Sequence, residues 1–364
     1  MGKTVRLWFT VRMADETVAT RLRRRAVTIP AYATALVLLV GLAPILAPVL
    51  FLVDVARGSR LAATRLVLFG IAFFAAELLG LLASALGSVV FVRAHARRLA
   101  WHYALQTAWA RVLFGAARLL FRFDVAIDGD EAVPPGPVLV LARHVSLADT
   151  LLPAVFLAHR HGLRLRYVLK RELLWDPCLD VVGHRLPNAF VARGSEDSAR
   201  EIARVRDLAR GIGLGEGVLI YPEGTRFTPA KHGRALARVA EHDPVRHRRV
   251  RTLAHVLPAQ LGGTLGLFDA CPGADVLFLA HTGFEGVTTL RRVLDGALVG
   301  RTIRIAFWRV RAGDVPRANA ERIGWLDGEW KRMDAWVGAH STVYGSSRHE
   351  RSVSGSRSVS ARSS

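Results

Sequence analysis

The sequence predicts an α/β domain in which helices cover a mixed sheet, preceded by a transmembrane helical hairpin. Two observations support this. From residue 123 onward, short apolar stretches alternate with longer stretches of helical period, a pattern typical of α/β domains. Before them, residues 26–53 and 66–92 contain one charged side chain between them, Glu77. Each segment exceeds the ~20 residues that a helix needs to cross a bilayer.

The basic residues predict how the hairpin is oriented. Residues 1–25 carry seven of them, residues 54–65 between the two apolar segments carry three, and more follow residue 92. Positive charge favours the cytoplasmic side, so we expect both ends in the cytoplasm and the link across the membrane. This predicts a multi-pass protein of the cell inner membrane with a cytoplasmic catalytic domain. Because Pro30, Pro44 and Pro48 interrupt the first segment, a kinked or partly re-entrant helix stays open.

Composition narrows the class of partner. The chain has 364 residues, a formal charge of +20 and 51% hydrophobic residues. Such a charge favours a polyanion; with two apolar spans present, anionic membrane lipids are the expected partner, and no nucleic acid is expected. Two distant cysteines, Cys178 and Cys271, suit a reducing compartment.

Three further segments flank or follow the hairpin. Residues 1–25 form a basic cytoplasmic N-terminus, and residues 341–364, rich in Ser and Arg, are predicted to be disordered. Residues 93–122 form an amphipathic helix, either interfacial on the membrane or packed on the domain. Within the second span, Glu77 belongs to an ion path or, as we favour, is a helix-paired side chain.

Residues 123–340 make up the α/β domain. Its expected helices are 149–160, 196–213 and 317–337. The expected strands are 123–127, 137–142, 165–169, 188–192, 217–221, 276–280 and 302–309.

Two polar motifs follow two of these strands. His144 comes directly after the apolar run that ends at Arg143, and Asp149 lies five residues on. Five residues turn a regular helix by about 500 degrees, so the two side chains meet only if His144 lies in the turn before the helix. There the carboxylate could orient the imidazole as a general base. The alternative is a structural role, in which the polar pair caps a helix.

The second motif, Glu223-Gly224-Thr225-Arg226, follows the apolar run 217–220. Glycine permits close backbone approach to a ligand, and a guanidinium suits bidentate contact with phosphate. The alternative is a structural turn with an internal Glu–Arg pair.

Together, the two motifs resemble those of the glycerolipid acyltransferase family, in particular 1-acylglycerol-3-phosphate acyltransferases. That family carries an N-H-x-x-x-x-D block and an E-G-T-R block in this order. Residues 190–193 resemble its second block and residues 255–258 its fourth, so the resemblance covers about a third of the chain. One position departs from the pattern: Arg143 replaces the usual asparagine, and we expect it to tune His144 or to bind an acceptor anion.

The resemblance implies acyl transfer from a thioester, acyl-CoA or acyl-ACP, to the hydroxyl of 1-acylglycerol-3-phosphate, giving phosphatidic acid in phospholipid biosynthesis. His144 would be the base and Asp149 its orienting partner. The resemblance further implies a lysophospholipid acceptor and no metal or cofactor, with acyl carrier protein as a candidate partner. The implied substrate-binding residues are Arg193, Glu223, Gly224, Thr225, Arg226 and Pro258.

Two other functions stay open. One is acyl transfer to a different lysophospholipid or specialised lipid hydroxyl, which the basic segment after Thr228 and the presence of Arg143 keep in view. The other is a non-catalytic lipid-binding protein, which would have no need of a base.

Overall fold

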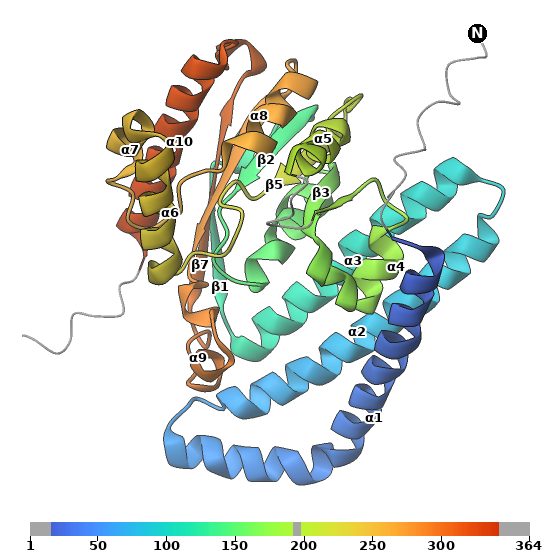
Figure 1. Ribbon diagram of the computed structural model, residues 1–364. Helices are drawn as coiled ribbons and strands as arrows, with labels where there is room; N and C mark the ends of the chain where they lie inside the picture. The colour runs from blue at the N-terminus through green and yellow to red at the C-terminus, as the bar shows by residue number, and fades with distance from the viewer. Residues whose placement is uncertain (1–15, 192–197, 342–364) are drawn as a thin grey trace, which may run out of the picture.

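The computed structural model describes residues 16–191 and 198–341. Its centre is a seven-stranded sheet of order β1-β7-β6-β2-β5-β3-β4, visible edge-on in Figure 1. Only the β6–β7 pair is antiparallel among these neighbours, so the predicted mixed sheet is confirmed. The strands are β1 (Asp124–Asp128), β2 (Val138–Ala142), β3 (Arg164–Lys170), β4 (Ala189–Val191), β5 (Glu216–Ile220), β6 (Asp275–Thr282) and β7 (Thr302–Val310).

Both faces of the sheet are covered, which explains why β2 and β5 are continuous apolar runs rather than alternating ones. Successive residues of β2 point to opposite faces: Leu139 and Leu141 belong to one core cluster, Val138 and Val140 to the other. The first face packs under α5 (Ser198–Leu208), α8 (Leu261–Ala270) and α10 (Asn319–His340). The second packs under α3 (His95–Phe121) and the short helical segment η3 (Pro153–His159).

The strands lie within two residues of their predicted positions, but the helices differ more. The expected helix 149–160 is a 3₁₀ turn, η2 (Ala148–Leu151), followed by the π-helical η3. Five further helices were not predicted from the sequence. These are α4 (Pro177–Gly183), α6 (Pro229–His242), α7 (Pro244–Val250), α8 and α9 (Leu290–Leu294).

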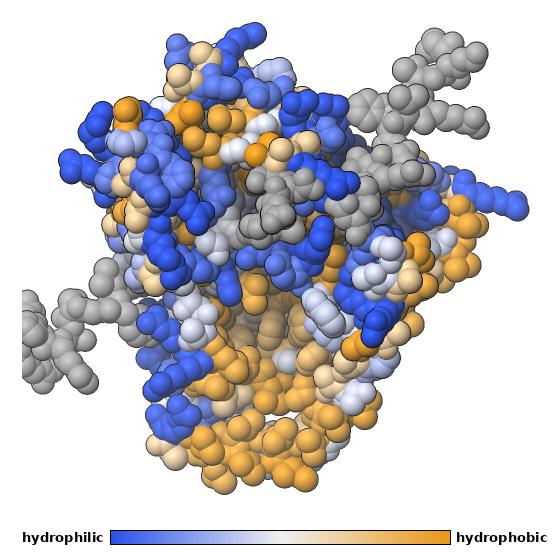
Figure 2. Space-filling model, in the orientation of Figure 1, coloured by the Kyte–Doolittle hydropathy of each residue, from blue (hydrophilic) through white to orange (hydrophobic). Residues whose placement is uncertain are grey.

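The two N-terminal apolar segments form a helical hairpin, as predicted. Both α1 (Val18–Arg57) and α2 (Ala62–Val90) are long and apolar enough to cross a membrane by length and composition. Figure 1 shows α1 descending from the domain and bending before α2 returns, and the bend accords with Pro44 and Pro48 inside α1. Figure 2 shows a continuous hydrophobic surface over this lower part of the molecule. Side chains such as Val37 and Leu52 are exposed there.

The link between the two helices lies against the catalytic domain. Arg57 forms an ion pair with Asp295, 3.0 Å from Nη2 to Oδ1, at the end of α9. Arg60 donates to the carbonyl of Val299 at 3.5 Å. These contacts argue against the expected topology, because a link bound to the catalytic domain is not on the opposite side of the membrane from it.

The beginning of α1 is also held by the domain. Arg24 and Arg25 both bind the buried carboxylate of Asp180 in α4, at 3.0 and 2.9 Å. Although burial opposes it, hydrogen bonds from His184 and the two arginines hold the pKa of Asp180 well below its usual range. Both ends of α1 are therefore attached to the catalytic domain.

The second helix of the hairpin is joined to the domain by Glu77. Its carboxylate accepts from the indole N–H of Trp109 in α3 at 2.9 Å and from the backbone N–H of Cys178 in α4 at 3.1 Å. These contacts fit the expectation that Glu77 is paired with neighbouring helices. Helix α3 itself buries one face, including Leu113 and Phe114, against the domain, which is the second of its two expected arrangements.

Candidate active site

The imidazole of His144 and the carboxylate of Asp149 are in direct contact. Nδ1 of His144 lies 2.9 Å from Oδ1 of Asp149. This contact requires the turn between them: His144 lies beyond the end of β2, and Asp149 lies in the first turn of η2. As predicted from the five-residue spacing, the two side chains meet because His144 lies outside the helix.

Asp149 is oriented by three other groups as well. Its Oδ2 accepts the backbone N–H groups of Val145 at 2.6 Å and Ser146 at 2.7 Å. The Nε2 atom of His281, in β6, lies 3.5 Å from the same oxygen. Although burial opposes it, the hydrogen bond from His144 and the nearby His281 lower the pKa of Asp149. The carboxylate is thus kept ionised and fixed beside the imidazole.

His144 lines a mainly apolar cavity of about 270 Å³. The walls come from α3, η2, η3, β3 and α4, and Arg226 and Tyr221 lie in them together with His144. The apolar lining includes Trp109, Ala110, Leu147, Leu151, Ala154, Val168, Leu169, Leu173 and Leu179. With Nδ1 bound to Asp149, Nε2 has no hydrogen bond to any described residue. The arrangement therefore offers a base beside a space suited to an apolar chain.

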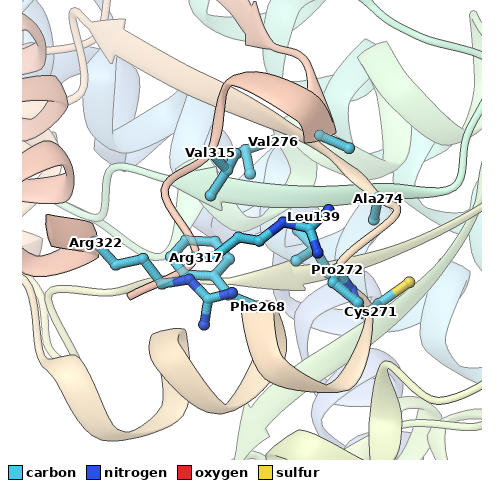
Figure 3. Close-up of a pocket in the computed structure, with 10 residues that line it drawn as sticks. Leu139, Phe268, Cys271, Pro272, Ala274, Val276, Val315, Arg317 and Arg322 are labelled. Carbon is cyan, nitrogen blue, oxygen red and sulfur yellow. The ribbon is translucent and has the colours of Figure 1, made fainter. Parts of the chain in front are cut away.

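A second cavity, shown in Figure 3, is too small to be a substrate site. It lies near Leu139 at the start of β2, beside Phe268 and Cys271, and measures about 20 Å³. That is room for about one water molecule.

Comparison with known proteins agrees with this geometry. Residues 124–247 match a family model described as Acyltransferase. These residues, about a third of the chain, are similar to acyltransferase domains. The 1-acyl-sn-glycerol-3-phosphate acyltransferase of Pseudomonas aeruginosa is 28% identical over 127 residues, which are 35% of this chain and 47% of that protein. The chain thus matches about half the length of that curated relative.

A solved structure is similar at lower identity. The crystal structure of the 1-acyl-sn-glycerophosphate (LPA) acyltransferase, PlsC, from Thermotoga maritima is 15% identical, with a TM-score of 0.46. The similarity covers 72% of this chain and 97% of that one. The predicted resemblance to acyltransferases of this kind is confirmed by the family model and by the curated relative, each over about a third of the chain.

Of the substrate-binding residues expected in the acyltransferase domain and just beyond it, Arg226 lines the cavity with His144. Thr225 instead accepts from Nζ of Lys231 at 2.8 Å. Gly224 has a φ of +70°, and an added Cβ would lie 2.6 Å from the side chain of Gln260. This side of Gly224 therefore faces other protein atoms and not the cavity. Pro258 is buried and does not line the cavity. Arg193 lies outside the described residues.

Glu223 holds the backbone of His144 in place and lies outside the cavity. Oε1 accepts the backbone N–H of His144 at 2.8 Å, and Oε2 accepts that of Leu257 at 2.9 Å. The side chain is buried and absent from the cavity wall, so its expected contact with substrate is replaced by a positioning role. Burial raises its pKa to about 7, although Arg143 and the two backbone donors lower it.

Arg143 does not face the cavity, contrary to its expected role as an anion-binding residue. It is buried and donates to the carbonyls of His281 at 2.7 Å and His255 at 3.1 Å. It also forms a 2.6 Å ion pair with Glu285. Arg143 thus connects the end of β2 to two later segments of the chain, around His255 and around His281 and Glu285.

Two features were not predicted from the sequence: the position of His281 and the packing of the Tyr221 ring on His144. The ring of Tyr221 lies 4.7 Å from that of His144, between centroids, at an angle of 38°. His281 is fully buried near the end of β6, and its Nε2 lies 3.1 Å from the carbonyl of Arg143. A polar residue in the strand run 275–282 was the available signal, since His281 and Thr282 are the polar members after Asp275.

Proposed function

We propose that this protein transfers a fatty acyl group from acyl-CoA or acyl-ACP to the free hydroxyl of 1-acylglycerol-3-phosphate, giving phosphatidic acid. The observation that carries the proposal is the contact of His144 with Asp149, with His144 in the wall of the mainly apolar cavity. The matched family model and the curated relative support the reaction class. The acceptor is proposed from the name of that relative.

The reaction needs a base, an orienting acid and a place for the chain. Nε2 of His144 takes the proton of the acceptor hydroxyl, whose oxygen attacks the thioester carbonyl carbon. The ionised Asp149 stabilises the resulting imidazolium through its contact with Nδ1. Collapse of the tetrahedral intermediate forms the ester and expels the thiolate, which takes the proton from the imidazolium. No acyl-enzyme, metal or cofactor enters this sequence.

Arg226 is proposed to hold the acceptor phosphate. It lines the cavity beside His144, and its guanidinium can form two parallel hydrogen bonds to phosphate oxygens. A hydroxyl next to a phosphate held there would reach the base.

Membrane attachment is proposed to occur through the α1–α2 hairpin. The apolar exposed faces of these helices support insertion, and an anionic lipid surface suits the net charge. Because the link and the start of α1 both contact the catalytic domain, we propose that the link lies on the same, cytoplasmic, side of the inner membrane as that domain. The acceptor could then enter laterally from the lipid.

The test is acyl transfer by membranes containing the wild type or His144→Ala. A long-chain acyl thioester is offered with lysophosphatidic acid, lysophosphatidylglycerol or lysophosphatidylethanolamine. We expect transfer to lysophosphatidic acid by the wild type and loss of it in the variant. Transfer to another acceptor would keep the mechanism and change the substrate, whereas full activity of His144→Ala would refute the assigned base.

A further inference from the structure

The hydroxyl of Tyr221 is buried beside the proposed base without a partner. Tyr221 follows directly after β5 and lines the same cavity as His144. Its ring packs on the imidazole at 4.7 Å between centroids. The hydroxyl oxygen is buried and has no hydrogen-bond partner among the described residues.

Such a hydroxyl calls for an explanation. Leaving a buried donor unpaired costs about 1–3 kcal/mol, and most buried polar atoms in native proteins have a partner. A phenylalanine would fill the same place without that cost. The hydroxyl therefore fits a ligand group that arrives in the cavity, and burial together with the charge of Asp149 raises the pKa of Tyr221, so it stays protonated and can donate.

Three backbone donors of the base-bearing turn are already used. The N–H of His144 binds Glu223, and those of Val145 and Ser146 bind Asp149. The N–H of Gly224, in the facing turn, binds the carbonyl of Tyr221. These groups cannot stabilise negative charge on a substrate oxygen without breaking contacts that hold the site.

We infer that the Tyr221 hydroxyl donates a hydrogen bond to the thioester carbonyl oxygen, and that it stabilises the oxyanion formed when the acceptor attacks. The inference rests on the proposed function. As the acceptor oxygen bonds to the carbonyl carbon, the π electron pair moves onto the carbonyl oxygen, and Tyr221 donates to it while keeping its proton. When the thiolate leaves, the pair returns and the carbonyl re-forms.

Tyr103, in α3, provides a matched control. Its hydroxyl is also buried and has no hydrogen-bond partner among the described residues. Unlike Tyr221, it does not line the cavity that holds His144. Removing its hydroxyl tests what the loss of any buried, unpaired hydroxyl does to this protein.

The experiment compares the wild type, Tyr221→Phe and Tyr103→Phe in detergent micelles, with palmitoyl-CoA and lysophosphatidic acid. For Tyr221→Phe we expect kcat to fall by about 10²–10³-fold, the usual effect of removing one oxyanion donor. KM should change little, and thermal unfolding should occur at the same or a higher temperature, because an unpaired hydroxyl is gone. Tyr103→Phe should keep near wild-type kcat.

Each other result overturns the inference. Wild-type kcat in Tyr221→Phe would remove the hydroxyl from the reaction, and an equal loss in Tyr103→Phe would show that losing any buried hydroxyl has this effect. A fall in kcat that accompanies a lower unfolding temperature in Tyr221→Phe would make the residue structural. A wild type that transfers no acyl group would instead refute the proposed function and this inference with it.

Discussion

The carboxylate of Glu223 accepts the backbone N–H of His144 at 2.8 Å. The contact joins the turns that follow β2 and β5, two neighbouring parallel strands whose carboxyl ends meet at one edge of the sheet. Its other oxygen binds the N–H of Leu257. The buried side chain of Glu223 thus links the backbone of His144 to its own segment and to that of Leu257.

Glu223→Gln is expected to lower both stability and activity. The amide nitrogen of Gln would face one of the two backbone N–H donors, leaving that donor unpaired at a cost of about 1–3 kcal/mol. Urea unfolding and kcat check this. An exposed substitution, Glu241→Gln in α6, is the control and should change neither. A Gln variant as stable and active as wild type would contradict the bracing role.

Stability should also depend on pH through Glu223. Because burial raises its pKa to about 7 from an ordinary 4.5, the folded state binds this proton more tightly than the unfolded state. The stability from this group is complete below about pH 4.5 and is lost as the pH rises to about 7. Comparing wild type and Glu223→Gln by urea unfolding from pH 4.5 to 8 isolates the effect, since the variant should lack this part of the slope. Equal slopes would show that the carboxyl is ionised throughout.

Asp149→Asn should reduce kcat by about 10²–10⁴-fold, the range of a general base that has lost its correct orientation. An asparagine places a donor where the carboxylate accepts from His144, Val145 or Ser146. Steady-state kinetics with circular dichroism as a folding control tests the prediction. Activity within tenfold of wild type in a folded variant would show that the imidazole needs no carboxylate.

His281→Leu should lower kcat by removing a donor that faces Asp149. The Nε2 atom of His281 lies 3.5 Å from Oδ2 of Asp149 and 3.1 Å from the carbonyl of Arg143. Burial lowers the pKa of His281, so the ring acts here as a hydrogen-bond donor and not as a charge. His281→Gln, which keeps a donor, should retain more activity, with circular dichroism as the folding control. Wild-type kcat in the Leu variant would leave His281 as packing alone.

Arg226→Ala should lower kcat/KM for lysophosphatidic acid by about 10–100-fold, the value of a hydrogen bond to a charged group of about 1.5–3 kcal/mol. The loss should appear mainly as a higher KM for the acceptor and leave the KM of the thioester nearly unchanged. Arg238→Ala, which removes an exposed charge on α6, is the matched control. An equal loss in both variants would indicate general surface charge instead of a phosphate site.

The position of the link is testable by labelling. In a Cys271→Ser background, Arg60→Cys should react with an impermeant maleimide in inside-out vesicles, because Arg60 contacts the catalytic domain at Val299. Arg332→Cys, on the exposed surface of α10, marks the cytoplasmic side in the same vesicles. Labelling of residue 60 from the opposite side only would restore the two-crossing topology.

Local pattern determined much of this protein. Strand-length apolar runs located central strands such as β2 and β5, because a strand buried on both faces has to be largely apolar. The turn between His144 and Asp149 could be predicted from helical geometry, since the two residues are five apart in the chain. Two long apolar segments, with Glu77 as their one charged side chain, likewise identified α1 and α2.

Only the tertiary structure decided which distant residues meet. His281 reaches Asp149, and Glu223 reaches His144, because the sheet order places β2 between β6 and β5. Arg143 points away from the cavity since Glu285 and two carbonyls lie behind it. The link of the hairpin contacts α9 across more than two hundred residues of chain. Hydrogen bonds and ion pairs of this kind depend on position in space, and no spacing along the chain encodes them.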